Sequence, residues 1–242
     1  MQLAHQRTRP PCPVAQAFVT TWEAGLSEND RRRIAAPLRA RLGGTRTAVG
    51  TAMGKAATAG DWLVHTCAPV WLEIAHADPG ALAALRACPS LSADTDDRRG
   101  RIAVDRAIQS VLAARMLACN AAWSRSRPAE PELGAEAGRI VEQLLPLATE
   151  AVFGRTGFAA ALAAADRAPF TNRWATLRDH LFGLAQAAVS TLTWQAVWST
   201  TAARGSGTWT MAAQRRLDRE IALLTTQLQP QALLLAQRML AP

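Results

Sequence analysis

The sequence is uncharged over the stretch Leu181-Phe-Gly-Leu-Ala-Gln-Ala-Ala-Val-Ser-Thr-Leu-Thr-Trp-Gln-Ala-Val-Trp-Ser-Thr-Thr-Ala-Ala203. At about 23 residues, this stretch is long enough to cross a bilayer. It also carries Gln186, Gln195 and several Ser and Thr residues, and every polar group in hydrocarbon needs a hydrogen-bond partner. We therefore predict the central buried helix of a helical bundle here and no transmembrane segment.

Alanine is also abundant elsewhere in the sequence, as in the runs Ala159–Ala161 and Ala163–Ala165. Alanine is the strongest helix former because it loses no side-chain entropy in a helix. The chain has no β-branched run, and no segment alternates polar and apolar residues over the length of a strand. These patterns predict an all-α fold, a bundle-like domain of roughly eight to ten helices.

Glycine, proline and capping residues divide the chain into expected helices. Ser27 and Asp61 are predicted helix N-caps. Pro37 is predicted to kink or split its helix, Pro69 to bend its helix, and Pro230 to interrupt the last one. The expected helices cover residues 14–23, 27–42, 48–59, 62–77, 79–88, 99–124, 135–153, 157–167, 170–203 and 208–240.

The domain organisation is expected to be simple. Residues 1–13 are polar and proline-bearing and are predicted to form a disordered arm. Residues 14–242 are predicted to form one all-α domain, with a subdomain joint near 126–134 as the alternative. No repeat of fixed period is present, so the sequence does not indicate a solenoid.

The charge is strongly positive. The chain has 27 basic and 19 acidic residues, a formal net charge of +8, and Lys55 is its only lysine. Arginine in place of lysine, abundant alanine and the absence of tyrosine indicate the codon bias of a GC-rich bacterial genome. The first residues lack the apolar core of a secretory signal, and the four cysteines form no C-x-x-C motif. A cytoplasmic location with reduced thiols is therefore expected.

Clustered arginines are the strongest physical feature of the sequence. Arg31, Arg32 and Arg33 form one group, and Arg98, Arg99 and Arg101 form another. Such groups can neutralise phosphates without reading bases, so sequence-independent nucleic-acid binding is one hypothesis. Acidic residues such as Glu28 and Asp30 lie beside each group, and solvated, partly ion-paired helix faces are the simpler interpretation.

No complete metal or phosphate motif is present. Glu73 and His76 have the E-x-x-H spacing that places both side chains on one helix face, as in one half of a di-iron site. A second E-x-x-H is missing, so no metal or other cofactor is predicted. The segment from Gly50 to Ala56 lacks the spacing and the hydroxyl of a P-loop, and the acidic residues at 94–97 are interpreted as a capping loop.

Tryptophan is enriched, with eight residues in the chain. Trp62 and Trp71 lie on one expected helix, and Trp194 and Trp198 form an i, i+4 pair on another. These rings are candidates for an apolar ligand pocket or an interface. Core packing between alanine-rich helices is the alternative interpretation.

Three segments carry a family resemblance: Arg41-Leu-Gly-Gly-Thr-Arg46, Asp61-Trp-Leu-Val-His65 and Pro69-Val-Trp-Leu72. They resemble helical proteins of actinobacterial type that are rich in alanine, arginine and tryptophan. The resemblance covers about a third of the chain and implies no activity and no site residues.

The absence of a complete catalytic set favours a non-catalytic function. The first hypothesis is a helical protein-interaction or regulatory protein, with another protein or a second copy of the chain as its partner. Nucleic-acid binding through the arginines is the alternative. A second alternative is a helical-bundle enzyme or carrier with an apolar pocket near Glu73 and His76, so the question of catalysis stays open at this point.

Overall fold

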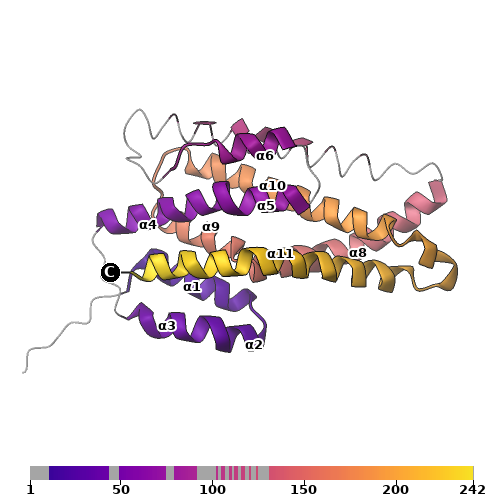
Figure 1. Cartoon of the computed structure of the whole chain (residues 1–242), viewed down its shortest axis with the longest axis horizontal. Helices are drawn as coiled ribbons and strands as arrows, with labels where there is room; N and C mark the ends of the chain where they lie inside the picture. The colour runs from indigo at the N-terminus through magenta and orange to yellow at the C-terminus, as the bar shows by residue number, and fades with distance from the viewer. Residues whose placement is uncertain are drawn as a thin grey trace, which may run out of the picture.

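The computed structural model describes residues 11–43, 49–74, 79–91 and 131–241, together with scattered residues between 102 and 124 (Figure 1). These residues form helices, turns and short connections and contain no strand. The predicted all-α fold is therefore confirmed. The first ten residues of the predicted arm lie outside the described part of the chain.

The helices follow one another with short connections. In chain order they are α1 (Pro13–Gly25), α2 (Glu28–Asp30), η1 (Arg31–Ala35), α3 (Ala36–Leu42), α4 (Val49–Trp62), η2 (Leu63–Cys67), α5 (Ala68–Ile74), α6 (Pro79–Arg86), α8 (Pro131–Arg155), α9 (Phe158–Arg167), α10 (Trp174–Trp198), η3 (Thr201–Ser206) and α11 (Trp209–Leu240). The segments α2–η1–α3 and α4–η2–α5 are each one continuous helix.

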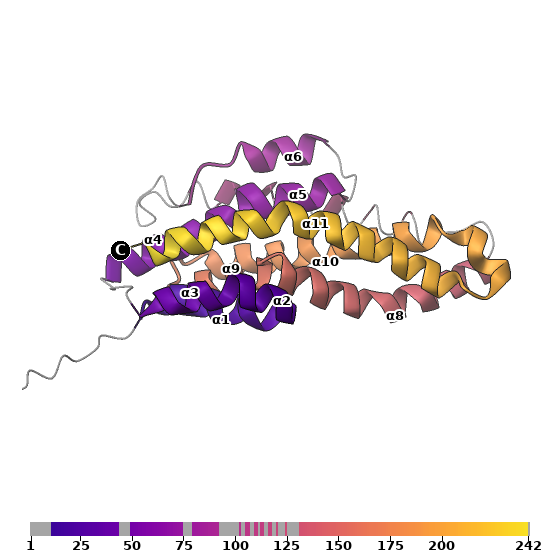
Figure 2. The ribbon, with the colours of Figure 1, turned by 60° about the horizontal axis from the view of Figure 1, so that its bottom comes forward.

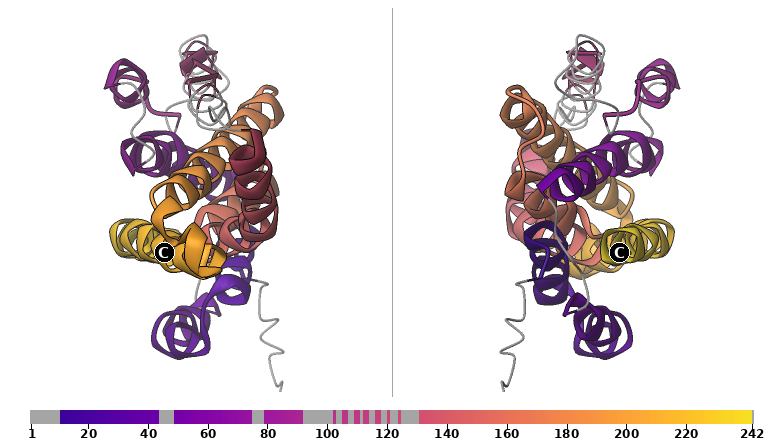
Figure 3. Two further views of the ribbon diagram at one scale, coloured as in Figure 1. Left: turned by 90° about the vertical axis from the view of Figure 1, so that its right-hand side faces the viewer. Right: turned by 90° about the vertical axis from the view of Figure 1, so that its left-hand side faces the viewer.

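The helix α11 runs along the length of the molecule and ties its parts together. It contacts α8 and α10 along much of its length, and also α3, α4 and α5 (Figure 1). In the turned view of Figure 2, α1 and α3 lie on one side of the bundle, and α6 lies at the outer edge of the other. The end views of Figure 3 show α8, α10 and α11 grouped together, with α6 projecting away from them.

The small residues of α9 allow α1 and α4 to pack closely against it. Ala160, Ala161, Ala164 and Ala165 are all buried, and α9 packs against both α1 and α4. Alanine side chains are short, so neighbouring helix axes can lie closer together than leucine would permit. The alanine runs that predict a helix from propensity therefore also shape the core.

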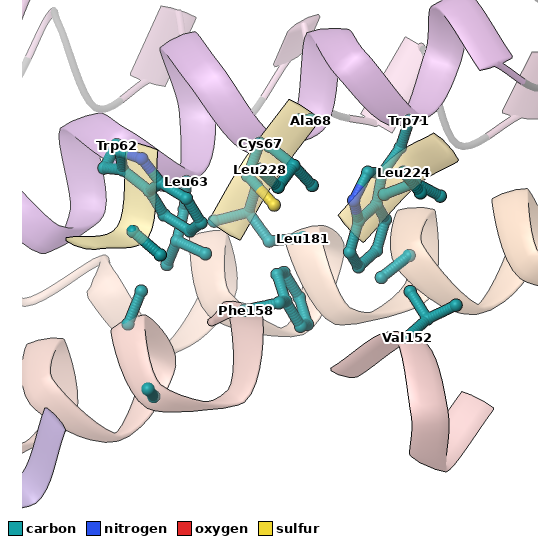
Figure 4. Close-up of a cluster of buried hydrophobic side chains, with 14 of the residues drawn as sticks. Trp62, Leu63, Cys67, Ala68, Trp71, Val152, Phe158, Leu181, Leu224 and Leu228 are labelled. Carbon is teal, nitrogen blue, oxygen red and sulfur yellow. The ribbon is translucent and has the colours of Figure 1, made fainter. Parts of the chain in front are cut away.

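Large side chains fill the space where the helices diverge. Trp71 of α5 stacks on Phe153, with ring centroids 5.8 Å apart, and lies 4.6 Å from the ring of Phe158. Figure 4 shows Trp71 and Phe158 beside Leu181 of α10 and Leu224 of α11. One hydrophobic cluster thus joins segments that are far apart in the sequence.

The uncharged stretch forms α10 from Leu181 to its end at Trp198 and then continues beyond the helix. Leu181, Leu184 and Leu192 are buried, and α10 contacts α5, α8 and α11. The hydroxyls of the buried Thr191 and Thr193 donate to backbone carbonyl oxygens one turn earlier, so they are satisfied within the helix. None of the described helices combines the length and the apolarity needed to cross a bilayer. The position of α10 at the centre of the bundle stays a prediction.

Two of the helix prolines follow a widened turn. At η2, the N–H of Ala68 donates to the carbonyl oxygen of Leu63, five residues earlier, and Pro69 comes next. The same pattern at η1 precedes Pro37. A proline ring clashes with the preceding turn of a regular helix, and a π-helical turn gives it room. The predicted bends are therefore single widened turns, and both helices continue past the proline.

The predicted interruption at Pro230 is wrong. The helix α11 continues through this residue to Leu240. Pro230 is exposed, so water can satisfy the carbonyl of Thr226, which would otherwise accept the missing N–H.

Of the two predicted helix N-caps, one is confirmed and the other is wrong. Ser27 caps its helix as predicted, because its Oγ accepts the N–H of Asp30 at 3.2 Å. The predicted cap Asp61 instead lies inside the continuous helix formed by α4, η2 and α5. At the proposed joint near 126–134, α8 already begins at Pro131, so the last four of those residues are helical.

The contact between α1 and α8 depends on two glycines. A Cβ atom added to Gly154 would lie 2.7 Å from the Cα of Gly25, and a Cβ on Gly25 would meet the backbone of Gly154. We expect Gly154→Ala to lower the free energy of unfolding by about 3 kcal/mol, because two backbones must separate. Urea unfolding followed by circular dichroism measures this change.

Gly138→Ala is the matched control on the same helix. A Cβ at Gly138 meets nothing within 4 Å. The same substitution should therefore stabilise the protein by up to about 1 kcal/mol through helix propensity. Equal effects of Gly138→Ala and Gly154→Ala would contradict the backbone contact.

Candidate functional site

The described residues line a pocket between α4–η2 and the C-terminal turns of α11, which we call the α4–α11 pocket. Its volume is about 600 Å³, which is within the usual range of small-molecule sites. The lining residues are Thr58, Asp61, Trp62, His65, Thr66, Ser90, Gln231, Leu234, Leu235 and Arg238. Segments about 170 residues apart in the sequence therefore form its two walls.

Asp61 organises one side of the pocket. Its Oδ2 accepts the hydroxyl of Ser90 at 2.6 Å, and its Oδ1 accepts the backbone N–H of Leu91. These bonds fasten residues 90 and 91 onto the middle of a long helix. Because Asp61 lies within the helix, its carboxylate holds a distant loop instead of capping a helix end.

His65 lies one turn after Asp61 on the same face of the helix. The His65 Nε2 is 3.8 Å from the Asp61 Oδ1, which is too long for a hydrogen bond. Nε2 is buried and has no hydrogen-bond partner among the described residues. His65 belongs to the π-helical turn η2, so the widened turn before Pro69 helps to set the position of the imidazole.

Two further pocket residues carry donors without acceptors. Trp62 is only 8% exposed, and its indole Nε1 is buried. This N–H has no hydrogen-bond acceptor among the described residues. The guanidinium of Arg238 is exposed and makes no hydrogen bond or ion pair with described residues. An unpaired buried donor costs free energy, roughly 1–3 kcal/mol, so the pocket contains unused hydrogen-bonding capacity.

Part of the remaining wall is apolar, beside the polar side chains of Thr66 and Gln231. Leu235 and the ring of Trp62 are buried, whereas Leu234 is 48% exposed at the pocket. Thr58 contributes little polarity, because its hydroxyl donates to the Gly54 carbonyl oxygen at 2.8 Å. The pocket thus has an apolar wall beside a set of unused donors.

The predicted pair Glu73 and His76 does not form a described site. His76 lies outside the described residues. Glu73 is exposed and its carboxylate is ion-paired with Arg86 of α6, and it does not line the α4–α11 pocket. No group of three or more metal-binding side chains occurs in the part of the chain that the structure describes.

The four candidate tryptophans separate into different environments. Trp62 lines the α4–α11 pocket, and Trp71 is buried in the core. Trp194 and Trp198 are half-buried and stack on each other with centroids 6.2 Å apart, and Trp198 lies 6.3 Å from Trp209. Only Trp62 of the four is therefore in the pocket.

The first arginine group is engaged locally. Arg31 and Arg32 both pair with Glu28 at 3.0 Å, and Arg33 pairs with Asp30 at 2.9 Å. These exposed pairs bridge adjacent turns of one helix. The second group, Arg98, Arg99 and Arg101, lies outside the described residues.

Sequence reasoning identified Trp62 but missed most of the pocket. Asp61 and His65 have the i, i+4 spacing of one helix face, which the sequence could have indicated. Ser90 and Arg238 carry no such signal, because only the packing of α11 brings Arg238 to α4.

Cys67 lies in the cluster of buried hydrophobic side chains shown in Figure 4 and is fully buried. Burial raises the pKa of the Cys67 thiol well above its usual value. The unfolded chain releases this proton near pH 8.5, whereas the folded protein retains it. The free energy of unfolding should therefore fall as the pH rises above about 8.5, by up to about 1 kcal/mol per pH unit from this group.

Urea unfolding between pH 7 and pH 10 measures that dependence. Cys67→Ala should be less stable at neutral pH but should show a flatter decline above pH 8.5, because the titrating thiol is gone. Parallel curves for the two proteins would refute the buried, protonated thiol.

The Asp61 bonds give a second expectation. Asp61→Ala should lower the free energy of unfolding by about 1–3 kcal/mol, because the half-buried Leu91 N–H loses its acceptor. Hydrogen exchange at the Leu91 amide should accelerate at the same time. Ser90→Ala removes the exposed hydroxyl bond to Asp61, keeps the acceptor of the Leu91 N–H and should leave the Leu91 exchange rate nearly unchanged. Equal acceleration in both variants would contradict this geometry.

No model of a protein family, no curated protein and no solved structure matches the chain significantly. The resemblance of residues 41–72 to alanine-, arginine- and tryptophan-rich helical proteins stays a prediction. The function of the chain is therefore argued from the pocket residues themselves.

Proposed function

We propose that the protein is a non-catalytic helical binding protein with a regulatory role, and that it binds a small molecule in the α4–α11 pocket. The observation that carries this proposal is the combination of a 600 Å³ pocket with polar groups on Trp62, His65 and Arg238 that have no partner among the described residues. A pocket with an apolar wall and a few convergent polar groups is the usual form of a ligand site.

The order of contacts around Asp61 supports binding over catalysis. A serine nucleophile needs a histidine that accepts its proton and a carboxylate behind that histidine. Here the Ser90 hydroxyl donates directly to Asp61, and His65 lies on the other side of the same carboxylate. The Ser90 hydroxyl therefore donates its proton to the Asp61 carboxylate, which also accepts the Leu91 N–H. This arrangement holds residues 90 and 91 in place and does not activate the serine.

The location of the pocket supports a regulatory role. A ligand there would contact α4–η2 on one side and the last turns of α11 on the other. Binding to the folded state alone stabilises it by about 2.7 kcal/mol when the ligand is at 100 times its Kd. The ligand would therefore hold the end of α11 against α4, and it would alter the surface offered to a protein partner.

The nucleic-acid alternative has less support. Arg31, Arg32 and Arg33 each have an acidic partner within their own helix. Phosphate binding would have to compete with these pairs, although exposed pairs are worth only about 0–1 kcal/mol. No observation on the described residues favours this function over ligand binding.

Filling the pocket tests the proposal. Leu234→Trp places a large ring at an exposed position on the pocket wall. We expect members of a panel of small acids, amides, amines and nucleosides to raise the melting temperature of the unmodified protein. At saturating ligand the shift should be about 5 °C, and Leu234→Trp should abolish it.

Leu223→Trp is the matched control. Leu223 is also exposed on α11, three turns before Leu234 on the same face, and it does not line the pocket. The control should keep the ligand-induced shift. Loss of the shift in both variants, or no shift with any compound in the unmodified protein, would overturn the proposal.

A further inference from the structure

We infer that the α4–α11 pocket selects an organic acid, a carboxylate or phosphate monoester attached to an apolar body. This inference rests on the proposed function and specifies its ligand class. It follows from which hydrogen-bonding groups of the pocket are already used and which are not.

Two unused groups in the pocket can only donate, and the unpaired Nε2 of His65 donates when the imidazole carries its proton there. The indole N–H of Trp62 can only donate, and it has no acceptor among the described residues. The guanidinium of Arg238 is also donor-only and has no partner in that part of the chain. A ligand that satisfies these groups must supply acceptor oxygens.

The carboxylate oxygens in the pocket are already engaged. Both oxygens of Asp61 accept hydrogen bonds, from the Ser90 hydroxyl and from the Leu91 N–H. A ligand amine would have to compete with these bonds for Asp61. An amine would also approach the positive charge of Arg238 with no second carboxylate among the described lining residues. The pocket therefore disfavours cations and accommodates oxyanions.

Charge at this end of the molecule points the same way. Lys55 of α4 donates from its Nζ to the carbonyl oxygen of Ala241 at 2.9 Å, just beyond the last turn of α11. The carbonyl group is neutral, so this hydrogen bond does not neutralise the positive charge of Lys55. Lys55, beside the pocket, and Arg238, in its lining, thus place two positive charges near the α4–α11 junction, against one carboxylate among the described lining residues, that of Asp61. This balance favours an anion by Coulomb attraction.

The apolar wall defines the rest of the ligand. The ring of Trp62 and the side chains of Leu234 and Leu235 offer contact area beside the donors. An inorganic anion would leave this wall uncovered, whereas an aryl or alkyl group would bury it at about 25 cal/mol per Å². The arrangement fits an acid group at Arg238 with an apolar group against Trp62.

Calorimetric titration of the purified full chain with three matched probes tests the inference. Phenylacetate and phenyl phosphate carry an oxyanion on an aromatic body, and phenylacetamide is the uncharged counterpart. We expect at least one of the two acids to bind about tenfold or more tightly than the amide, because charge-assisted hydrogen bonds are the stronger ones. The better acid identifies which oxyanion the site prefers.

Substitution of Arg238 assigns the selectivity to the pocket. R238Q should weaken acid binding about 10- to 100-fold and leave amide binding nearly unchanged. R215Q is the matched control, because Arg215 is exposed on the same helix, is not ion-paired to a described residue and lies far from the pocket. W62F removes the indole donor together with part of the ring and should weaken the binding of the acid about fivefold or more. Circular dichroism checks that each variant is folded.

The outcomes separate this inference from the proposed function. Equal affinities for acid and amide, or equal effects of R238Q and R215Q, would overturn the oxyanion inference even if ligands bind in the pocket. Tighter binding of an amine from the panel would also overturn it. Absence of any ligand-induced stabilisation, or stabilisation that survives Leu234→Trp, would overturn the proposed function itself.

Discussion

The short buried face of α9 sets the spacing of the helices around it. Ala160, Ala161, Ala164 and Ala165 are buried where α9 meets α1 and α4, so these helices lie close together. Gly157, at the start of α9, has a φ of 81°, which favours glycine, and a Cβ there would lie 2.6 Å from the Cβ of Ala232 in α11. Small residues thus bring α1, α4 and α11 together, and the larger rings occupy the space left between them.

The sequence predicted the fold well because its signals are local. Alanine runs, the Ser27 cap and the breaks before α9 and α11 act through neighbouring residues, so their effects are visible without tertiary structure. Pro230 and Asp61 were misread for the opposite reason. The tolerance of α11 for a proline depends on that residue being exposed, and the role of Asp61 depends on a loop about 30 residues later.

The candidate site was much less predictable. Sequence patterns directed attention to His76, outside the described residues, and to Glu73 near the end of the α4–η2–α5 helix. The described pocket adjoins the middle of this helix, at Asp61 and His65. Arg238 joins them only through the packing of α11 on α4. The arginines that stood out in the sequence, Arg31 to Arg33, have partners within their own helix. Clustering of charge along a chain therefore says little about which charge is left unpaired in the fold.

The backbone contact between Gly25 and Gly154 has a consequence for how this sequence can change over time. A tight contact between two larger side chains can usually be rescued when one grows and the other shrinks. Here neither partner can shrink, because glycine is already the smallest residue and the contact is between main-chain atoms. No substitution at one position can therefore compensate for a larger residue at the other. A side chain at either position requires α1 to move relative to α8.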